Sequence, residues 1–218
     1  FDNIFSLGFA ASSVNAFDYV KHMICVSVII IITVINIIMI ITRMQNQGYK
    51  SLAFYKQSEI IHDFTVEFVK LYIDYHSRTK DQMEQSARSG KQNIAEGYTQ
   101  KSLESRIKLV GVARGSLEEL LNDYQDYLRQ HNLKFWTKDS PEARKVRALV
   151  YNPYNSYKNY KDYISSAEPA ANTMVCLINQ TNQLLDQKLR WMEEQFVKEG
   201  GFRENLFRKR MDYRKGKT

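Results

Sequence analysis

Apolar residues recur every three or four positions along several long stretches of the chain, a spacing that is typical of amphipathic helices. The first stretch covers residues 52–75. We expect Asp81 to cap a second helix, which has a narrow stripe of small and apolar residues. Gly97 is expected to end that helix in a left-handed turn, and Thr99 or Ser102 to cap the next one.

The third predicted helix has the most regular pattern. Its apolar positions alternate in steps of four and three from Leu103 to Leu128, a heptad-type seam that is broken by Arg114. A fourth helix is predicted from about Pro169 to Glu199. These patterns predict an all-α fold in which residues 44–200 form an antiparallel up-down four-helix bundle, with a long insert between helices three and four.

The predicted insert, residues 131–167, is rich in tyrosine. Pro141 after Ser140 predicts a short helix at its start. Tyrosines then follow at intervals of three, which on an α-helix would wrap around the axis. The run is either irregular or faces two different neighbours. Either its tyrosines pack on the bundle with their hydroxyls exposed to solvent, or their rings stack on nucleobases while the lysines contact phosphates. The stacking surface would consist of Tyr157, Lys158, Tyr160 and Lys161.

Basic residues are concentrated at the C-terminal end. The net charge is +7, and residues 203–218 hold seven basic residues against two acidic ones. We therefore treat residues 201–218 as a basic tail. Such a tail is either a solvated, partly disordered end or a binder of phosphate backbones without sequence preference. The residues expected to contact phosphates are Arg208, Lys209, Arg210, Arg214 and Lys215.

Residues 1–43 differ in composition from the rest of the chain. Residues 23–42 form an uncharged run of twenty residues, ten of them isoleucine, which is long enough to span a membrane. Two interpretations are open. Met44 opens a polar segment that resembles a natural start, which favours residues 1–43 as a non-native extension. Alternatively they are an anchor that makes the chain a membrane-tethered interaction module, with Arg43, Lys50 and Lys56 holding the following domain on the cytoplasmic side.

Two motifs carry a resemblance to a known family. QNIAEGY at residues 92–98 and KSLESRIKLVGVARGSLEEL at residues 101–120 resemble the four helix bundle proteins related to those encoded in intervening sequences of large-subunit ribosomal RNA genes. That group includes retroelement accessory proteins that partner reverse transcriptases. The resemblance covers roughly residues 52–128, and the stretch after Pro169 resembles the suffix of one branch. The motif residues, with structural roles, are Asn93, Glu96, Gly97, Arg114, Gly115 and Ser116.

The resemblance implies an up-down bundle that forms homo-oligomeric rings, often five-membered, and has no enzymatic activity. It also implies association with nucleic acid or with a partner protein such as a reverse transcriptase. The chain departs from commoner members at residues 87–91, where a pair of arginines is usual. A basic surface on that helix is therefore not carried over.

Arg114 stands out because burying an unpaired arginine is costly. It either pairs with Glu96 or Glu118 or lines a pore and meets phosphate. Its helix is basic in the first half and acidic in the second, against the helix dipole. Either these charges lie on a solvated face, or they are complementary to charges on a neighbouring subunit. Gly111 and Gly115 are expected where helices approach closely.

No catalytic set is apparent. His62 and His76 are fourteen residues apart, about 21 Å along a helix, which is too far for one metal ion. GVARGS lacks the ending of a phosphate loop. Cys25 and Cys176 form no CxxC motif, which favours a reducing, cytoplasmic compartment. We predict a non-enzymatic, nucleic-acid-associated or scaffolding protein without cofactor or metal, whose partners are copies of itself, RNA or DNA, and a partner protein.

Overall fold

The computed structural model describes residues 21, 23, 26–35, 48–152 and 155–216. The chain divides into two compact units, Phe1–Gly48 and Tyr49–Thr218. In the first unit, residues 26–35 are helical and exposed. Much of the uncharged run at residues 23–42 lies outside the described residues. Within the described ones, no helix is both long and apolar enough to cross a membrane.

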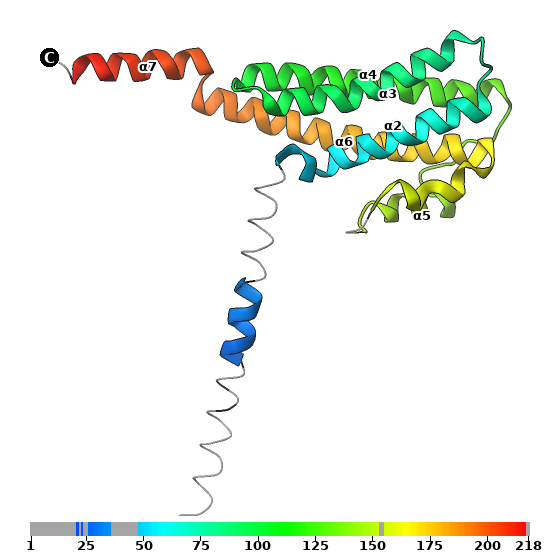
Figure 1. Cartoon of the computed structure of the whole chain (residues 1–218), viewed down its shortest axis with the longest axis horizontal. Coiled ribbons are helices and arrows are strands. Elements are labelled where there is room, and N and C mark those ends of the chain that lie inside the picture. The colour runs from blue at the N-terminus through cyan, green and yellow to red at the C-terminus, as the bar shows by residue number, and fades with distance from the viewer. Residues whose placement is uncertain (1–20, 22, 24–25, 36–47, 153–154, 217–218) are drawn as a thin grey trace, which may run out of the picture. The chain divides into compact units, whose positions relative to one another are not determined.

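The second unit is helical, and no strand occurs in the part of the chain that the structure describes. The predicted all-α class is therefore confirmed. Figure 1 shows α2, α3, α4 and α6 alongside one another. The elements are η1 (Gly48–Ser51), α2 (Ala53–Tyr72), α3 (Arg78–Thr99), α4 (Leu103–Gln130), α5 (Pro141–Leu149), η2 (Tyr157–Ser165), α6 (Ala167–Glu199) and α7 (Phe202–Lys215).

Serine side chains cap two of the long helices. The Ser77 hydroxyl accepts a hydrogen bond from the Thr79 N–H at 3.2 Å, so α3 begins before Asp81. The predicted cap at Asp81 was wrong. Ser102 caps α4 as predicted, because its hydroxyl accepts from the Ser105 N–H at 3.4 Å.

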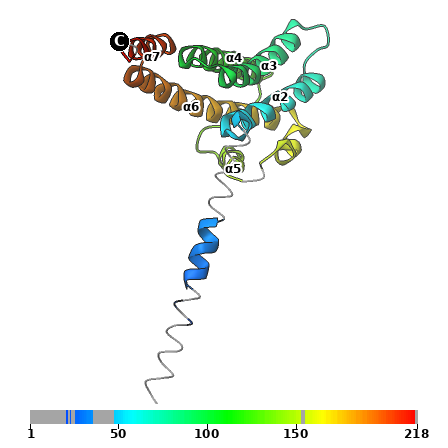
Figure 2. The ribbon, with the colours of Figure 1, turned by 60° about the vertical axis from the view of Figure 1, so that its left-hand side comes forward.

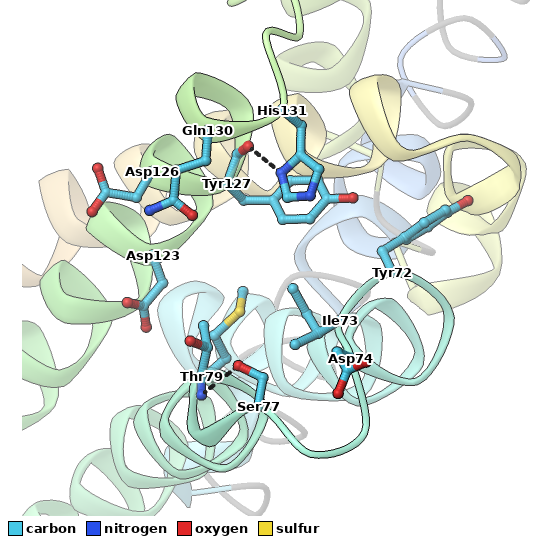
Figure 3. Close-up of a pocket in the computed structure, with 11 residues that line it drawn as sticks. Tyr72, Ile73, Asp74, Ser77, Thr79, Asp123, Asp126, Tyr127, Gln130 and His131 are labelled. Atoms are coloured by element: carbon cyan, nitrogen blue, oxygen red, sulfur yellow. Dashed lines mark hydrogen bonds between the residues drawn. The ribbon is translucent and has the colours of Figure 1, made fainter.

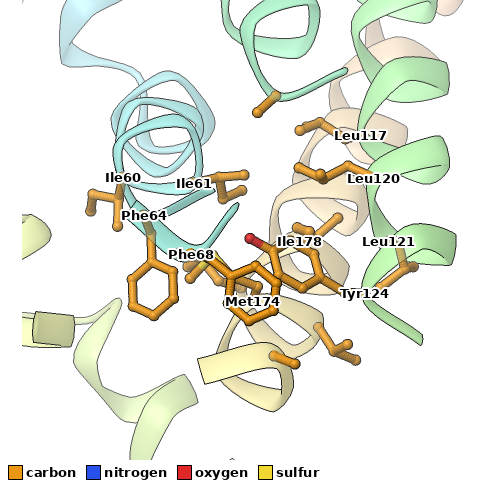
Figure 4. Packing of buried hydrophobic residues seen from close by; sticks show 14 of the residues in the cluster. Ile60, Ile61, Phe64, Phe68, Leu117, Leu120, Leu121, Tyr124, Met174 and Ile178 are labelled. Atoms are coloured by element: carbon orange, nitrogen blue, oxygen red, sulfur yellow. The ribbon is translucent and has the colours of Figure 1, made fainter. Parts of the chain in front are cut away.

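The core lies where α3 and α6 contact α4 and where α2 contacts α3 and α6. Tyr124 is fully buried there, and its hydroxyl donates to Thr65 Oγ1 at 3.0 Å. Each large apolar side chain buried in this way stabilises the fold by roughly 1.5–3 kcal/mol. Figure 4 shows the packing around Ile61, Phe64, Phe68, Leu117, Leu120, Met174 and Ile178.

Glycines of α3 face α4. The predicted left-handed stop at Gly97 is wrong, because α3 continues to Thr99. A Cβ at Gly97 would instead lie 3.3 Å from Leu109 Cβ on α4. Gly111 and Gly115, on α4, have no described atom within 4 Å of an added Cβ. The close approach expected at these two residues therefore does not occur within the described unit.

The segment between α4 and α6 packs on the outside of the core. α5 begins at Pro141 after the Ser140 cap, as predicted. The Trp136 N–H donates to Asn172 Oδ1 at 2.7 Å, which ties the start of this segment to α6. η2 contacts α6 and α2. It is a 3₁₀-helix, in which side chains three residues apart share one face, so Tyr157 and Tyr160 both face inward.

Candidate nucleic-acid interface

A two-glycine turn separates α7 from α6. Gly200 has a φ of 77°, a left-handed conformation that glycine adopts without strain, and it ends α6. Gly201 then precedes α7, and its N–H donates to Glu204 Oε2 at 2.9 Å. The C-terminal segment is thus a capped helix up to Lys215. The sequence had left a partly disordered end as one of two alternatives for this segment.

None of the side chains of α7 is buried. It holds six basic residues against Glu204 and Asp212. Its large apolar side chains are exposed as well, with Leu206 at 51% and Phe207 at 66%. In Figure 1, α7 continues beyond the end of α6. A helix with this composition and so little contact with its own protein offers both charge and apolar surface to a binding partner.

The exposed residues of α7 are arranged in two neighbouring rows along one side of the helix. The rows follow the spacing i, i+4, i+7 and i+11, which places their members on one face. Both rows mix basic with large apolar side chains. One row consists of Phe202, Leu206, Lys209 and Tyr213, and the other of Arg203, Phe207, Arg210 and Arg214.

A second cluster of basic and aromatic side chains lies near the start of α4. The Arg106 guanidinium sits 5.1 Å from the ring centre of Tyr98, and Lys188 Nζ lies 3.5 Å from the ring centre of Trp191. Arg106 Nε and the Tyr98 hydroxyl are buried atoms without a hydrogen-bond partner in the described part of the chain. Trp191 keeps 48% of its surface exposed.

Arg106 and Lys188 in this cluster are both positively charged and repel each other. Burial lowers the pKa of Lys188, and the neighbouring Arg106 lowers it further. Burial also raises the pKa of Tyr98 to about 12. Two cations that repel each other beside an exposed indole favour an anion with a planar group, such as a nucleotide.

The cluster and α7 belong to the same end of the helical unit. A Cβ at Gly201 would lie 2.6 Å from Glu104 Oε1, so α7 begins beside the first turn of α4. Lys188 is eleven residues before the end of α6, about 17 Å along its axis. Figure 2 shows α7 at the same end of the unit as the junction of α3 and α4.

The residues predicted to contact nucleic acid do not come together. The five basic residues of the tail lie on α7 and are exposed. Lys158 and Lys161 are also exposed, but they belong to η2, which precedes the start of α6. α6 has 33 residues, about 50 Å, so the two sets lie at opposite ends of that helix.

The tyrosines of η2 are not a stacking surface. Tyr160 is fully buried, so its ring has no free face for a base. The Tyr157 hydroxyl donates to Glu67, and its ring packs edge-on against Phe64 at 6.2 Å. The prediction that Tyr160 stacks on a nucleobase is corrected, because its ring is buried in packing. Tyr157 is half-buried, and its contacts favour the packing alternative.

Two motif residues, Gly97 and Ser116, lie where α3 and α4 contact each other. Ser89 and Ser116 join their hydroxyls at 2.8 Å, and Asn93 Nδ2 donates to Ser89 Oγ at 3.0 Å. Glu96 lies in the last turns of α3, where Thr99 donates its hydroxyl proton to the Glu96 carbonyl at 2.7 Å. Gly97 faces α4, as described above.

Arg114 forms ion pairs on the surface between α4 and α6. Its Nη1 lies 2.8 Å from Glu118 Oε2, as one alternative predicted, and its Nε lies 3.1 Å from Asp186 Oδ1. Asn182 Nδ2 also donates to Glu118 Oε2 at 3.0 Å. The pairing with Asp186 was not foreseen, because it joins residues 72 positions apart.

Sequence reasoning also missed the cluster around Arg106. Lys188 and Trp191 are three residues apart on α6, which is a readable signal for a cation over an aromatic ring. Arg106 lies on α4, whereas Lys188 and Trp191 lie on α6, so no short sequence pattern could show that they are close. Among the described residues, no group of three His, Cys, Asp or Glu side chains could hold a metal ion.

Comparison of the chain with family models, with curated proteins and with solved structures finds no match.

Proposed function

We propose that this chain is a non-enzymatic four-helix-bundle protein that binds nucleic acid through α7. In this proposal α2, α3, α4 and α6 form the antiparallel up-down bundle, and residues 131–167 are a Tyr-rich insert. The contacts of α4 with α3 and α6, and of α2 with α3 and α6, support the arrangement. Binding to a partner protein such as a reverse transcriptase and a cytoplasmic location stay predictions from the sequence.

The observation that carries the proposal is the exposure of α7. A basic helix that covered the core with an apolar face would be structural, but α7 buries none of its residues. Its arginines and lysines can each neutralise a phosphate and release bound counterions. Phe207 and Tyr213, at 66% and 65% exposure, offer rings on which unpaired bases stack. The ligand that fits this helix is therefore a single-stranded nucleic acid, bound without sequence preference.

The cluster of Arg106, Lys188 and Trp191 extends the interface. Arg106 lies two residues after Glu104, beside which α7 begins, and Lys188 lies about 17 Å before the end of α6. A strand whose backbone follows α7 would place a phosphate near Arg106 and a base on the exposed Trp191 ring. Such a site explains why two cations are kept close together despite their repulsion.

The test is fluorescence anisotropy of the full chain with a labelled 20-nucleotide single strand and with the matching duplex. Replacing Arg208, Lys209 and Arg210 with glutamine should weaken binding about tenfold or more at ~50 mM salt and flatten the salt slope by about 2, since each phosphate contact on a single strand contributes about 0.7. Phe207→Ala should weaken the single strand more than the duplex.

The matched control replaces Lys158 and Lys161 with glutamine, which removes charge at the far end of α6. It should bind almost as tightly as the wild type. Equal losses in both variants would mean that only net charge matters, and unchanged binding in the α7 variant would refute the proposal. Binding to anionic lipid vesicles in preference to nucleic acid would assign α7 to a membrane surface instead.

A further inference from the structure

The end of the helical unit opposite to α7 is acidic. A groove of about 720 Å³ lies between α3 and α4, and its walls include Asp81, Glu119 and Asp123. A second cavity of about 310 Å³ adjoins it and shares Asp123. Asp74 and Asp126 line this second cavity, as Figure 3 shows. We call these five carboxylates and the two cavities the acidic surface.

Few cations compensate the acidic surface. Arg78 lines the groove, and Arg129 lies 2.9 Å from Asp126. The Ser86 hydroxyl donates to Glu119 at 3.3 Å. Burial raises the pKa of Asp123, and the charges of Asp126 and Glu119 raise it further. A cationic partner would relieve this repulsion, and the negative end of the α4 dipole would favour it as well.

The acidic surface also has an apolar part. Figure 3 shows Tyr72, Ile73 and Tyr127 around the second cavity, beside the carboxylates. A partner with aromatic or aliphatic side chains next to its cations could therefore bury them here. α7 has this composition, because its exposed arginines and lysines lie among Phe202, Leu206 and Phe207. The two surfaces are complementary in charge and in the mixture of charge with apolar area.

α7 does not reach the acidic surface of its own chain. It begins beside Glu104, and Asp123 lies nineteen residues further along α4, about 28 Å away. Folded back along α4, the 14 residues of α7 would span about 21 Å and end near Glu118. Only Glu119 of the acidic surface comes near that level, and Asp123 and Asp126 lie four and seven residues further along α4. In the structure α7 extends beyond the end of α6 instead (Figure 1), so the contact comes from another molecule.

We propose that α7 of one copy docks on the acidic surface of a second copy, head to tail. This contact joins two different surfaces, so repetition gives a closed ring or an open chain. The proposal rests on the proposed function, because the same face of α7 binds nucleic acid. The acidic surface and a nucleic acid are then competing occupants of α7. Nucleic acid in excess should release the copies from one another.

The contact also accounts for the charge split along α4. Arg106 and Lys108 lie in the basic half near α7, and Glu119 and Asp126 in the acidic half. This order opposes the helix dipole within one molecule. In a head-to-tail assembly, the basic end of each copy meets the acidic end of the next. The split thus becomes favourable between molecules.

Sedimentation velocity over a range of protein concentrations tests the contact. The wild type should form species larger than a monomer as concentration rises, and these should dissociate as salt screens the charges. The double variant Glu119→Gln/Asp123→Asn should associate at least about tenfold more weakly, because both substitutions remove charge from the groove. Its affinity for the labelled single strand should be unchanged at protein concentrations at which copies do not associate. The control Glu142→Gln/Asp162→Asn removes two carboxylates that are exposed elsewhere and should associate as the wild type does.

Mixing two variants gives a sharper readout. The acidic-surface variant keeps α7, and the variant with glutamine at Arg208, Lys209 and Arg210 keeps the acidic surface. A mixture should therefore form a heterodimer and stop there, since each copy retains one half of the contact. A monomeric wild type at all concentrations, or an acidic-surface variant that associates normally, would overturn the docking proposal. Nucleic-acid binding by α7 could still hold in both cases, so the two proposals fail separately.

Discussion

A Cβ atom placed on Gly90 would lie 2.8 Å from both Cγ and Cδ2 of Leu117. Leu117 is fully buried on α4, and Gly90 lies on the face of α3 that packs against it. Real Cβ atoms do not come this close to other carbons, so the distance between α3 and α4 at this point requires a residue without a side chain. Gly90 is thus a packing residue, in contrast to Gly111 and Gly115.

Gly90 and Gly111 should respond oppositely to alanine. Gly90→Ala should lower the free energy of unfolding by about 1–3 kcal/mol, because the overpacking exceeds the gain in helix propensity. Gly111→Ala should raise it by up to about 1 kcal/mol, because the added Cβ meets open space and alanine favours the helix. Urea unfolding monitored by circular dichroism measures both. A destabilising Gly111→Ala in the dilute protein would contradict the open space described for this residue.

The buried hydrogen bond between Tyr124 and Thr65 should show as coupling in a double-mutant cycle. Tyr124→Phe should cost about 1–2 kcal/mol, since it leaves the Thr65 hydroxyl without this partner in the core. Thr65→Val should cost a similar amount by leaving the Tyr124 hydroxyl unpaired. The double variant should lose less than the sum of the two, because both polar groups are gone. Additive losses would argue against the bond.

The ion pairs of Arg114 should contribute modestly to stability and depend on salt. The side chains of Arg114, Glu118 and Asp186 keep between 33% and 41% of their surface exposed, so solvent screens the attraction. Arg114→Gln should lower the free energy of unfolding by about 0.5–1 kcal/mol at low salt and by less at ~1 M salt. A much larger loss that ignores salt would point to packing by the arginine stem.

The helices could be predicted from the sequence because each buries one face, and the period of that face is visible. Ser102 and Ser140 caps are local signals and were found. The first apolar stretch was expected to extend to Tyr75, which is 78% exposed. α2 ends at Tyr72, so periodicity was extended too far there.

Other features could not be predicted because they depend on contacts between distant elements. An α-helical period predicted a tyrosine run that is irregular or faces two neighbours, but in a 3₁₀-helix its spacing of three puts Tyr157 and Tyr160 on one face. That face packs toward α2 and α6, which buries Tyr160 fully and Tyr157 partly. The approach of Arg106 to Lys188 could not be predicted either, because it joins residues of two different helices. The basic residues of α7, by contrast, were identifiable from composition alone.

The last prediction concerns Asp123, whose pKa is raised by burial and by Asp126 and Glu119. An acid whose pKa is higher in the folded than in the unfolded chain destabilises the fold once it is ionised in both states. The free energy of unfolding should therefore fall as pH rises through the unfolded and folded pKa values of Asp123. Asp123→Asn should then unfold at a higher temperature than the wild type near pH 7, and the difference should shrink as the pH falls.

Asp139→Asn is the matched control, because the side chain of Asp139 is 82% exposed and lies 3.7 Å from Arg144. It should change the unfolding temperature little at any pH. The measurement uses dilute protein, in which copies do not associate. At high concentration the sign should reverse, since Asp123→Asn also weakens the proposed contact between copies, and association stabilises the folded chain by mass action. An asparagine variant that is less stable even in dilute solution would show that the Asp123 carboxylate is paired rather than repelled.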